Sequence, residues 1–150
     1  MEKVTIQGIK ANDHRILSRV ITRIENDDYV QDKRFIELYG QAQEAIRLGI
    51  TGPPGAGKST ITNELIKRFL KKNQTIGVIA IDPSSPFSGG ALLGDRVRMN
   101  HYNNDKSVFI RSMGTRGSLG GLARKTQEAG DILAASGKDI IIFETVGVGQ

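Results

Sequence analysis

One glycine-rich stretch in the first half of the chain has the residue types needed to bind phosphate. It reads GPPGAGKS from Gly52 to Ser59, so that two glycines are separated by four residues and followed directly by a lysine and a serine. Glycines let consecutive backbone N–H groups point inward at a phosphate, and the N-terminus of a following helix adds a favourable dipole. A short apolar run precedes the stretch and a helical pattern follows it, as this motif requires. The spacing predicts a P-loop that binds a nucleoside triphosphate.

Each part of the loop has an expected role at the phosphates. Lys58 would reach the β- and γ-phosphates, the Ser59 hydroxyl would bind magnesium, and Thr60 can contact the α-phosphate. The predicted nucleotide-binding residues of the loop are Gly52, Pro53, Pro54, Gly55, Ala56, Gly57, Lys58, Ser59 and Thr60. The alternative is a glycine-rich turn from strand to helix without a ligand.

Three acidic residues are placed where magnesium or an attacking water would need them. Asp82 and Glu144 each end an apolar run, and Asp95 lies in the glycine-rich segment SGGALLGDRVRM. Magnesium takes oxygen ligands and keeps several waters, so we expect these carboxylates in or next to its coordination sphere, together with Ser59. Lys58 and Glu144 are the predicted catalytic pair. Either aspartate could instead form a turn or cap a helix.

Two further loops could contribute to the same chemistry. The segment Glu144-Thr145-Val146-Gly147 resembles the switch segment of G proteins, in which an acidic residue is followed three positions later by glycine. The Gly147 backbone N–H could therefore bind the γ-phosphate, so that loss of this phosphate would release the loop. Arg116, in the glycine-rich segment 112–123, could stabilise transition-state charge or simply belong to a surface loop. His14 and His101 lie outside any metal-ligand spacing, which favours surface or packing roles.

The elements that must position these residues alternate between strands and helices. Apolar runs predict strands, and the segments between them predict helices: strands 46–51, 75–81, 108–110 and 139–143, and helices 60–72 and 122–135. Strands that are apolar on both faces belong to a parallel sheet covered by helices, which is an α/β fold. Right-handed crossovers bring all strand ends to one edge, where ligands bind. We therefore expect Gly52, Asp82, Arg111 and Glu144 near one crevice.

The first 45 residues have a different character. Residues 12–26 show the apolar spacing of an amphipathic helix, with Asn12 or Asp13 as its cap, and residues 31–45 predict a second helix. The pattern divides the chain into a helical extension, 1–45, and a nucleotide-binding domain, 46–150. The extension is expected to pack on that domain, although a partner-binding helix is the alternative.

The amino-acid composition excludes or disfavours several other classes of protein. The chain of 150 residues has no cysteine, which excludes a disulfide framework and a thiolate nucleophile. Its formal charge is +5, but its 21 Lys and Arg are scattered, which favours no nucleic-acid surface. No apolar window approaches the length of a membrane span, and the N-terminus lacks an apolar signal core. We expect no membrane association and a cytoplasmic location.

The order of motifs resembles the ArgK/MeaB family of P-loop GTPases, which includes the human methylmalonic aciduria type A protein. The similar segments cover most of residues 46–150 and read GITGPPGAGKST, VIAIDPSSPFSGGALLGDRVRM, VFIRSMGTRGSLGGLA and IIFETVGVGQ. The resemblance implies a magnesium-dependent GTPase that acts as a chaperone of an adenosylcobalamin-dependent acyl-CoA mutase, chiefly methylmalonyl-CoA mutase, and that forms a homodimer at full length. The alternatives are an ATPase or kinase of the lysine/arginine/ornithine transport type and a nucleotide-binding module without turnover.

The chain departs from the family in its length. Family members are considerably longer, and the Asn-Lys-x-Asp segment that reads guanine would lie beyond Gln150. The preference for GTP over ATP therefore comes from the resemblance alone. These residues are expected to be an N-terminal fragment whose sheet is incomplete.

Overall fold

The fold is built on one parallel sheet. The computed structural model describes residues 6–28, 38, 44–53, 55–86, 101–102, 105–115 and 119–145, with side chains for all of these except 82–86, 115 and 119–122. Four strands pair in parallel in the order β1-β4-β2-β3. Their bounds are β1 Ile46–Ile50, β2 Ile76–Pro86, β3 Val108–Thr115 and β4 Ile140–Thr145. The predicted α/β class with a parallel sheet is confirmed.

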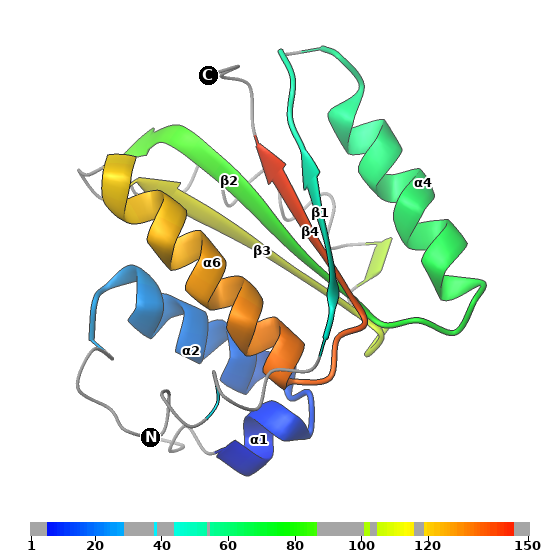
Figure 1. Cartoon of the computed structure of the whole chain (residues 1–150), viewed down its shortest axis with the longest axis horizontal. Helices are drawn as coiled ribbons and strands as arrows, with labels where there is room; N and C mark the ends of the chain where they lie inside the picture. Colours follow the sequence, from blue (N-terminus) through cyan, green and yellow to red (C-terminus); the bar gives the residue numbers. More distant parts are fainter. Residues whose placement is uncertain are drawn as a thin grey trace.

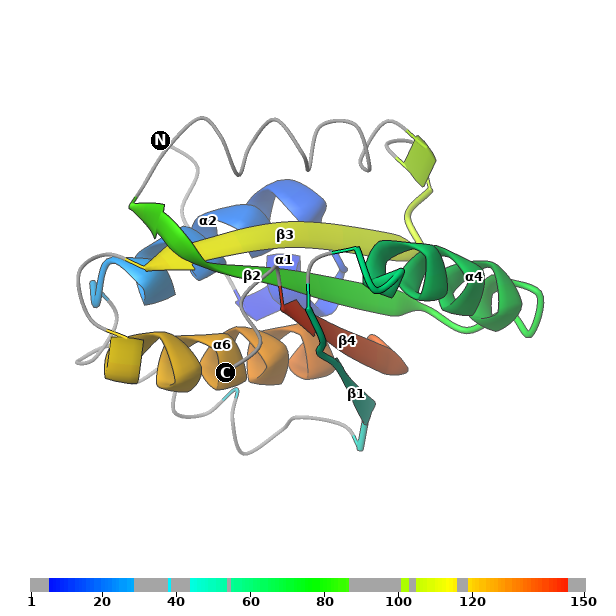
Figure 2. The same cartoon turned by 90° about the horizontal axis from the view of Figure 1, so that it is seen from above.

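Helices cover both faces of this sheet. They are α1 Ile6–Lys10, α2 His14–Glu25, α4 Lys58–Leu70 and α6 Leu119–Ala135. Helix α4 connects β1 to β2, and α6 connects β3 to β4, which is the crossover arrangement expected between parallel strands. Figures 1 and 2 show α2 and α6 side by side, with α4 set apart from both. Within the described residues, no helix is long and apolar enough to cross a bilayer.

Two hydrophobic cores lie on the two faces of the sheet. Alternate residues of a strand point to opposite faces, so Ile79 and Ile141 enter one core while Val78 and Ile142 enter the other. The first core joins these strands to α2 and α6, and the second joins them to α4 through Ile66. Because the central strands are buried on both sides, their sequences are apolar almost without interruption.

Helix α2 packs on the sheet together with α6. Asp13 caps it by accepting hydrogen bonds from the backbone N–H groups of Arg15 at 2.9 Å and Ile16 at 3.2 Å, which confirms one of the two predicted caps. Its apolar stripe is fully buried in the first core and consists of Leu17, Val20, Ile21 and Ile24. The predicted helix over 31–45 falls largely outside the described residues.

Candidate functional site

The carboxyl edge of the sheet brings the predicted loop and Glu144 together. In the register of the strands, Glu144 of β4 lies beside Ile50 of β1 and Ala80 of β2. The chain leaves β1 after Ile50 and enters the glycine-rich loop directly, so the loop starts at the level of Glu144, one residue before the end of β4. In the two remaining strands of the sheet, Asp82 of β2 pairs with Gly114 near the end of β3.

The glycine-rich loop turns through left-handed backbone conformations. Gly55 has φ of 75° and Gly57 has φ of 85°, values that residues with a Cβ rarely adopt. Gly57 is the N-cap of α4, and the Ile61 N–H donates to its carbonyl at 3.0 Å. The first backbone N–H groups of a helix have no carbonyl of an earlier turn to bind, and they give its N-terminus a partial positive charge. This positive end of α4 lies at the loop. This local structure is the one that a phosphate-binding loop needs.

Lys58 is buried beneath the loop and braces it. The side chain is 9% exposed, and its Nζ donates to the carbonyl oxygens of Gly52 at 2.7 Å and Pro53 at 2.8 Å. These bonds hold the ammonium group on the inside of the loop, at the N-terminus of α4. A positive charge placed there favours an anion at the same position as the loop amides do.

Glu144 is the acidic partner of α4. Its side chain is 1% exposed, and it accepts the hydroxyl of Ser59 on Oε1 at 3.0 Å and the hydroxyl of Thr62 on Oε2 at 2.6 Å. A buried carboxylate needs such partners because desolvation is otherwise costly. The structure therefore brings Lys58, Ser59 and Glu144, three residues singled out from the sequence, into one site.

A second contact ties the end of β4 to the start of the loop. The Thr145 hydroxyl donates to the Thr51 hydroxyl oxygen at 3.1 Å and lies 3.5 Å from the carbonyl oxygen of Ile50. The residue after Glu144 is thus held against the residue before the loop. A displacement of either segment would therefore break or move its contact with the other.

The donor set at this position fits magnesium. Ser59 Oγ and Glu144 Oε1 are two neutral or anionic oxygens 3.0 Å apart at the mouth of the loop. Magnesium in nucleotide sites is held by one or two such protein groups, with phosphates and waters as the other ligands. Among the described residues, no three His, Cys, Asp or Glu side chains gather in a cluster that could hold a metal.

One positional prediction is wrong. Arg111 was expected at the nucleotide crevice, but its Nη2 donates to Glu25 Oε2 at 2.8 Å and to the Thr22 hydroxyl at 3.0 Å, both on α2. Arg111 follows Phe109 by two residues, so it points to the same face as that residue, which is the face covered by α2. The Arg111 side chain therefore stabilises the packing of α2 on the sheet and does not point to the nucleotide edge.

The other predicted residues divide into two groups. Gly52, Pro53, Gly55, Ala56, Gly57 and Thr60 lie in the loop or the first turn of α4. Asp82 is placed at the carboxyl edge by its backbone alone. The predictions at Pro54, Asp95, Arg116 and Gly147 fall outside the described residues.

The sequence reasoning missed Thr62. Only 3% of this residue is exposed, and its hydroxyl contacts Glu144. Its position three residues after Ser59 and four after Lys58 places all three on one side of α4, because residues at these spacings share a helix face. That spacing is the signal that could have identified it.

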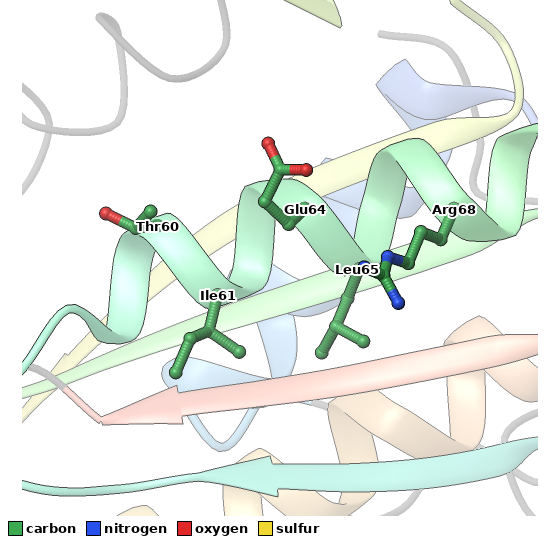
Figure 3. Close-up of a pocket in the computed structure, with 5 residues that line it drawn as sticks. All are labelled: Thr60, Ile61, Glu64, Leu65 and Arg68. Atoms are coloured by element: carbon green, nitrogen blue, oxygen red, sulfur yellow. The ribbon is translucent and has the colours of Figure 1, made fainter.

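A hollow beside the loop has a different lining. It encloses about 290 Å³ and is lined by Thr60, Ile61, Glu64, Leu65 and Arg68 of α4. Figure 3 shows Ile61 and Leu65 projecting from one side of the helix and Thr60 and Glu64 from the other. Thr60 is the one predicted nucleotide-binding residue in this lining, so the hollow borders the candidate site without coinciding with it.

Comparisons with known proteins give this site a family context. The family model described as "Methylmalonyl Co-A mutase-associated GTPase MeaB" matches residues 17–150. A "Putative GTPase" of Pyrococcus abyssi (strain GE5 / Orsay) is 54% identical over 145 residues, which are 97% of this chain and 45% of the relative. "GTPase ArgK" of Escherichia coli (strain K12) is 36% identical over 154 residues, with 97% and 45% covered.

A mitochondrial relative shows similarity over a shorter region. The "Methylmalonic aciduria type A homolog, mitochondrial" of Mus musculus is 48% identical over 115 residues, which are 76% of this chain and 28% of the relative. The chain spans less than half the length of each of these three relatives. The region that the family model matches, residues 17–150, contains the loop, α4 and β4, and therefore every described residue of the candidate site.

Proposed function

The chain belongs to the family of methylmalonyl-CoA mutase-associated GTPases MeaB, and on that premise we propose that the protein binds GTP with magnesium and hydrolyses it. The observation that carries this proposal is the meeting of Lys58, Ser59 and Glu144 at one edge of the sheet. Family membership shows common ancestry, but it does not by itself show that this chain has the groups needed for catalysis. The geometry of the site adds the cation, the hydroxyl and the carboxylate that phosphoryl transfer to water requires.

Each side chain has a role that follows from its position. Lys58 stabilises negative charge on the β- and γ-phosphates by reaching them from beneath the loop, and the loop amides contact the same oxygens. Glycines at 52, 55 and 57 allow the backbone to approach the phosphates closely. Thr60, at the exposed start of α4, contacts the α-phosphate. The contribution of this machinery is mainly positioning and electrostatic stabilisation.

Ser59 and Glu144 would hold magnesium, and Asp82 and Asp95 are proposed to stand in or next to its coordination sphere. When bound, magnesium neutralises charge that develops on the phosphates. Glu144 keeps the Ser59 hydroxyl oriented. Its carboxylate can also accept a hydrogen bond from a water at the mouth of the loop. Gly147 is proposed to contact the γ-phosphate through its backbone N–H, which would couple the presence of that phosphate to the segment after β4.

The partner in this proposal is an adenosylcobalamin-dependent acyl-CoA mutase. The support is the family to which the chain belongs, whose name refers to association with methylmalonyl-CoA mutase. In this function the nucleotide state of the loop would regulate contact with the mutase, and the GTPase would act as its chaperone. A cytoplasmic location and a homodimer of the full-length protein complete the proposal.

Hydrolysis by the full-length protein is the first test. We expect magnesium-dependent release of phosphate from GTP, with ATP a poorer substrate, and loss of turnover by about a hundredfold or more in Lys58→Ala and Glu144→Gln. Lys71→Ala is the matched control, because Lys71 is an exposed lysine at the other end of the same helix. Turnover that survives in Lys58→Ala would contradict the proposal.

The same hydrolysis and binding experiments also distinguish the alternative functions from the proposed one. Preference for ATP would favour the transport-type ATPase, and tight nucleotide binding without turnover would favour a binding module. Co-purification with the mutase in the presence of GTP or GDP tests the partner, and light scattering of the full-length protein tests the homodimer. A mutase that binds neither nucleotide state would contradict the chaperone role.

A further inference from the structure

The carboxylate of Glu144 is held by two hydroxyl groups from the same helix. Ser59 donates to Oε1 at 3.0 Å, and Thr62 donates to Oε2 at 2.6 Å. Each oxygen of the carboxylate therefore has its own donor, and both donors come from the first two turns of α4. The shorter distance is in the range of a strong hydrogen bond between a hydroxyl and a carboxylate.

The Thr62 hydroxyl has an alternative acceptor in its own helix. Its Oγ1 lies 3.0 Å from the carbonyl oxygen of Lys58, four residues earlier, which is the usual partner of a helical threonine. A hydroxyl has one proton and donates to one acceptor at a time. The carboxylate is the closer and the more strongly charged acceptor, and the Lys58 carbonyl already receives the backbone N–H of Thr62 in the helix.

We propose that Thr62 is a positioning residue for Glu144, and that its hydroxyl sets the affinity of the site for magnesium. This inference rests on the proposed GTPase function and adds a residue to it. With Oε2 fixed by Thr62, Oε1 stays against Ser59, so the two oxygens expected to hold the ion remain at the mouth of the loop.

Burial makes the role of Thr62 difficult to replace. Thr62 is 3% exposed and Glu144 is 1% exposed, so bulk water has little access to the lost donor position. Valine has the shape of threonine without its hydroxyl, and Thr62→Val would leave Oε2 with one donor fewer in a desolvated place. Groups that orient a metal ligand in this way typically change metal affinity by about 10- to 100-fold when removed.

Nucleotide binding with and without magnesium tests the inference apart from catalysis. In the full-length protein, the affinity for a fluorescent, non-hydrolysable GTP analogue is measured in saturating magnesium and in EDTA. We expect Thr62→Val to weaken binding about tenfold or more in magnesium and to change it little in EDTA. Thr62→Ser keeps the hydroxyl and is expected to restore the magnesium effect.

Thr126→Val is the matched control. Thr126 is a buried threonine of α6, and its hydroxyl has no hydrogen-bond partner among the described residues. The same substitution there is expected to leave both affinities unchanged. If Thr62→Val does not fold, the pair Thr62→Ser and Thr62→Ala decides, because these two variants differ only in the hydroxyl.

The outcomes distinguish the inference from the function on which it rests. A wild-type protein that binds the analogue equally well in magnesium and EDTA would overturn both. A clear magnesium effect in the wild type that is equally large in Thr62→Val, or equally large in the serine and alanine variants, would overturn the role of Thr62 alone. Equal losses in magnesium and in EDTA would assign Thr62 a general structural role and would also overturn the inference.

Discussion

Ser59 and Glu144 lie 85 residues apart in the sequence, yet the Ser59 hydroxyl donates to Glu144 Oε1 at 3.0 Å. Ser59 lies in the first turn of α4, and Glu144 lies in the last part of β4. Because β1 pairs directly with β4, the loop that leaves β1 has to pass the end of β4, and the contact follows from strand order. The pair therefore links two motifs that sequence order keeps far apart.

Removal of the Ser59 hydroxyl is predicted to uncouple these motifs. Ser59→Ala leaves Glu144 Oε1 without this donor and removes an oxygen ligand of the proposed magnesium site. We expect the affinity for a magnesium–GTP analogue complex to fall about 10- to 100-fold, with a smaller change in EDTA. Fluorescence titration of the full-length protein measures both.

Ser136→Ala is the control for that experiment. Ser136 is also buried, and its hydroxyl donates to the Leu133 carbonyl at 2.7 Å. It directly follows α6 and is remote from the loop in sequence. Each substitution removes one hydroxyl hydrogen bond, which contributes about 1 kcal/mol to stability. A loss of magnesium affinity as large in Ser136→Ala as in Ser59→Ala would contradict a specific role of Ser59.

The ion pair of Glu25 with Arg111 is predicted to stabilise the docking of α2. Glu25 is 8% exposed and accepts from Arg111 at 2.8 Å, while the Arg111 side chain is 27% exposed. Glu25→Gln leaves the partly buried guanidinium of Arg111 without its counter-charge, and the loss of one partner from such a pair is costly. Since Arg111 is partly exposed, we expect a decrease of about 2 kcal/mol in the free energy of unfolding, measured in urea.

Glu64→Gln is the matched control for Glu25→Gln. Glu64 pairs with Lys67 at 2.7 Å on the exposed side of α4, where solvent screens the interaction. We expect its effect on unfolding to be small. Equal destabilisation by the two substitutions would mean that burial of the Glu25 pair is not what stabilises α2.

Sequence reasoning predicted the layers of the fold better than the direction of individual side chains. Continuous apolar runs identify the four strands, but β2 and β3 extend past those runs, because backbone pairing continues to Asp82 and Gly114 regardless of side-chain polarity. Strand order along the chain does not say which face a residue occupies, and so Arg111 was assigned to the wrong place. Its true partner, Glu25, lies on α2, and local spacing carries no signal for that contact.

The site shows the same difference between motif and contact. A fixed spacing identifies Lys58 and Ser59, since loop and helix geometry are local. Glu144 was found by its place after an apolar strand. Thr62 was not found, because its importance arises from Glu144, a residue 82 positions away. Periodicity could have placed Thr62 on the face of Lys58, but only the packing of α4 against β4 gives it a partner.

His14 is predicted to make the fold less stable in acid. Its ring packs edge-on against Phe109 with centroids 5.3 Å apart, which confirms a packing role. Burial, and then the nearby charge of Lys138, lower the pKa of His14 below its ordinary value of 6.5, against an opposing backbone hydrogen bond to Lys106 and the charges of Asp13 and Asp105. The unfolded chain therefore binds a proton more readily than the folded chain.

The sign of this effect follows from that difference. The stabilisation is present above the unfolded pKa and is lost as the pH falls through 6.5 toward the lower folded pKa. We expect the free energy of unfolding to decline less steeply on acidification in His14→Gln than in the wild type. His101→Gln is the control, since His101 is exposed. Identical slopes for all three proteins would contradict the prediction.

Lys138 is predicted to act in the same direction as His14, but in a more alkaline pH range. This lysine is 1% exposed, and its Nζ donates to the carbonyl oxygens of Lys106 at 3.2 Å and Ser107 at 3.4 Å. Burial lowers its pKa to about 8 from an ordinary 10.5, although Asp105 and Asp139 oppose the shift. Two long hydrogen bonds to neutral acceptors only partly replace the water that the ammonium group loses on folding.

The lowered pKa makes the folded state gain stability as the pH rises. Between about pH 8 and pH 10.5, the folded chain has released the Lys138 proton and the unfolded chain still holds it, so the free energy of unfolding increases with pH by about 3 kcal/mol at most. Urea unfolding across this range should show the increase in the wild type and in Lys71→Met, whose lysine is exposed. Lys138→Met should lack it, because no buried proton remains to be released. If the increase persists in Lys138→Met, the stabilisation comes from another group and the buried ammonium does not destabilise the fold at neutral pH.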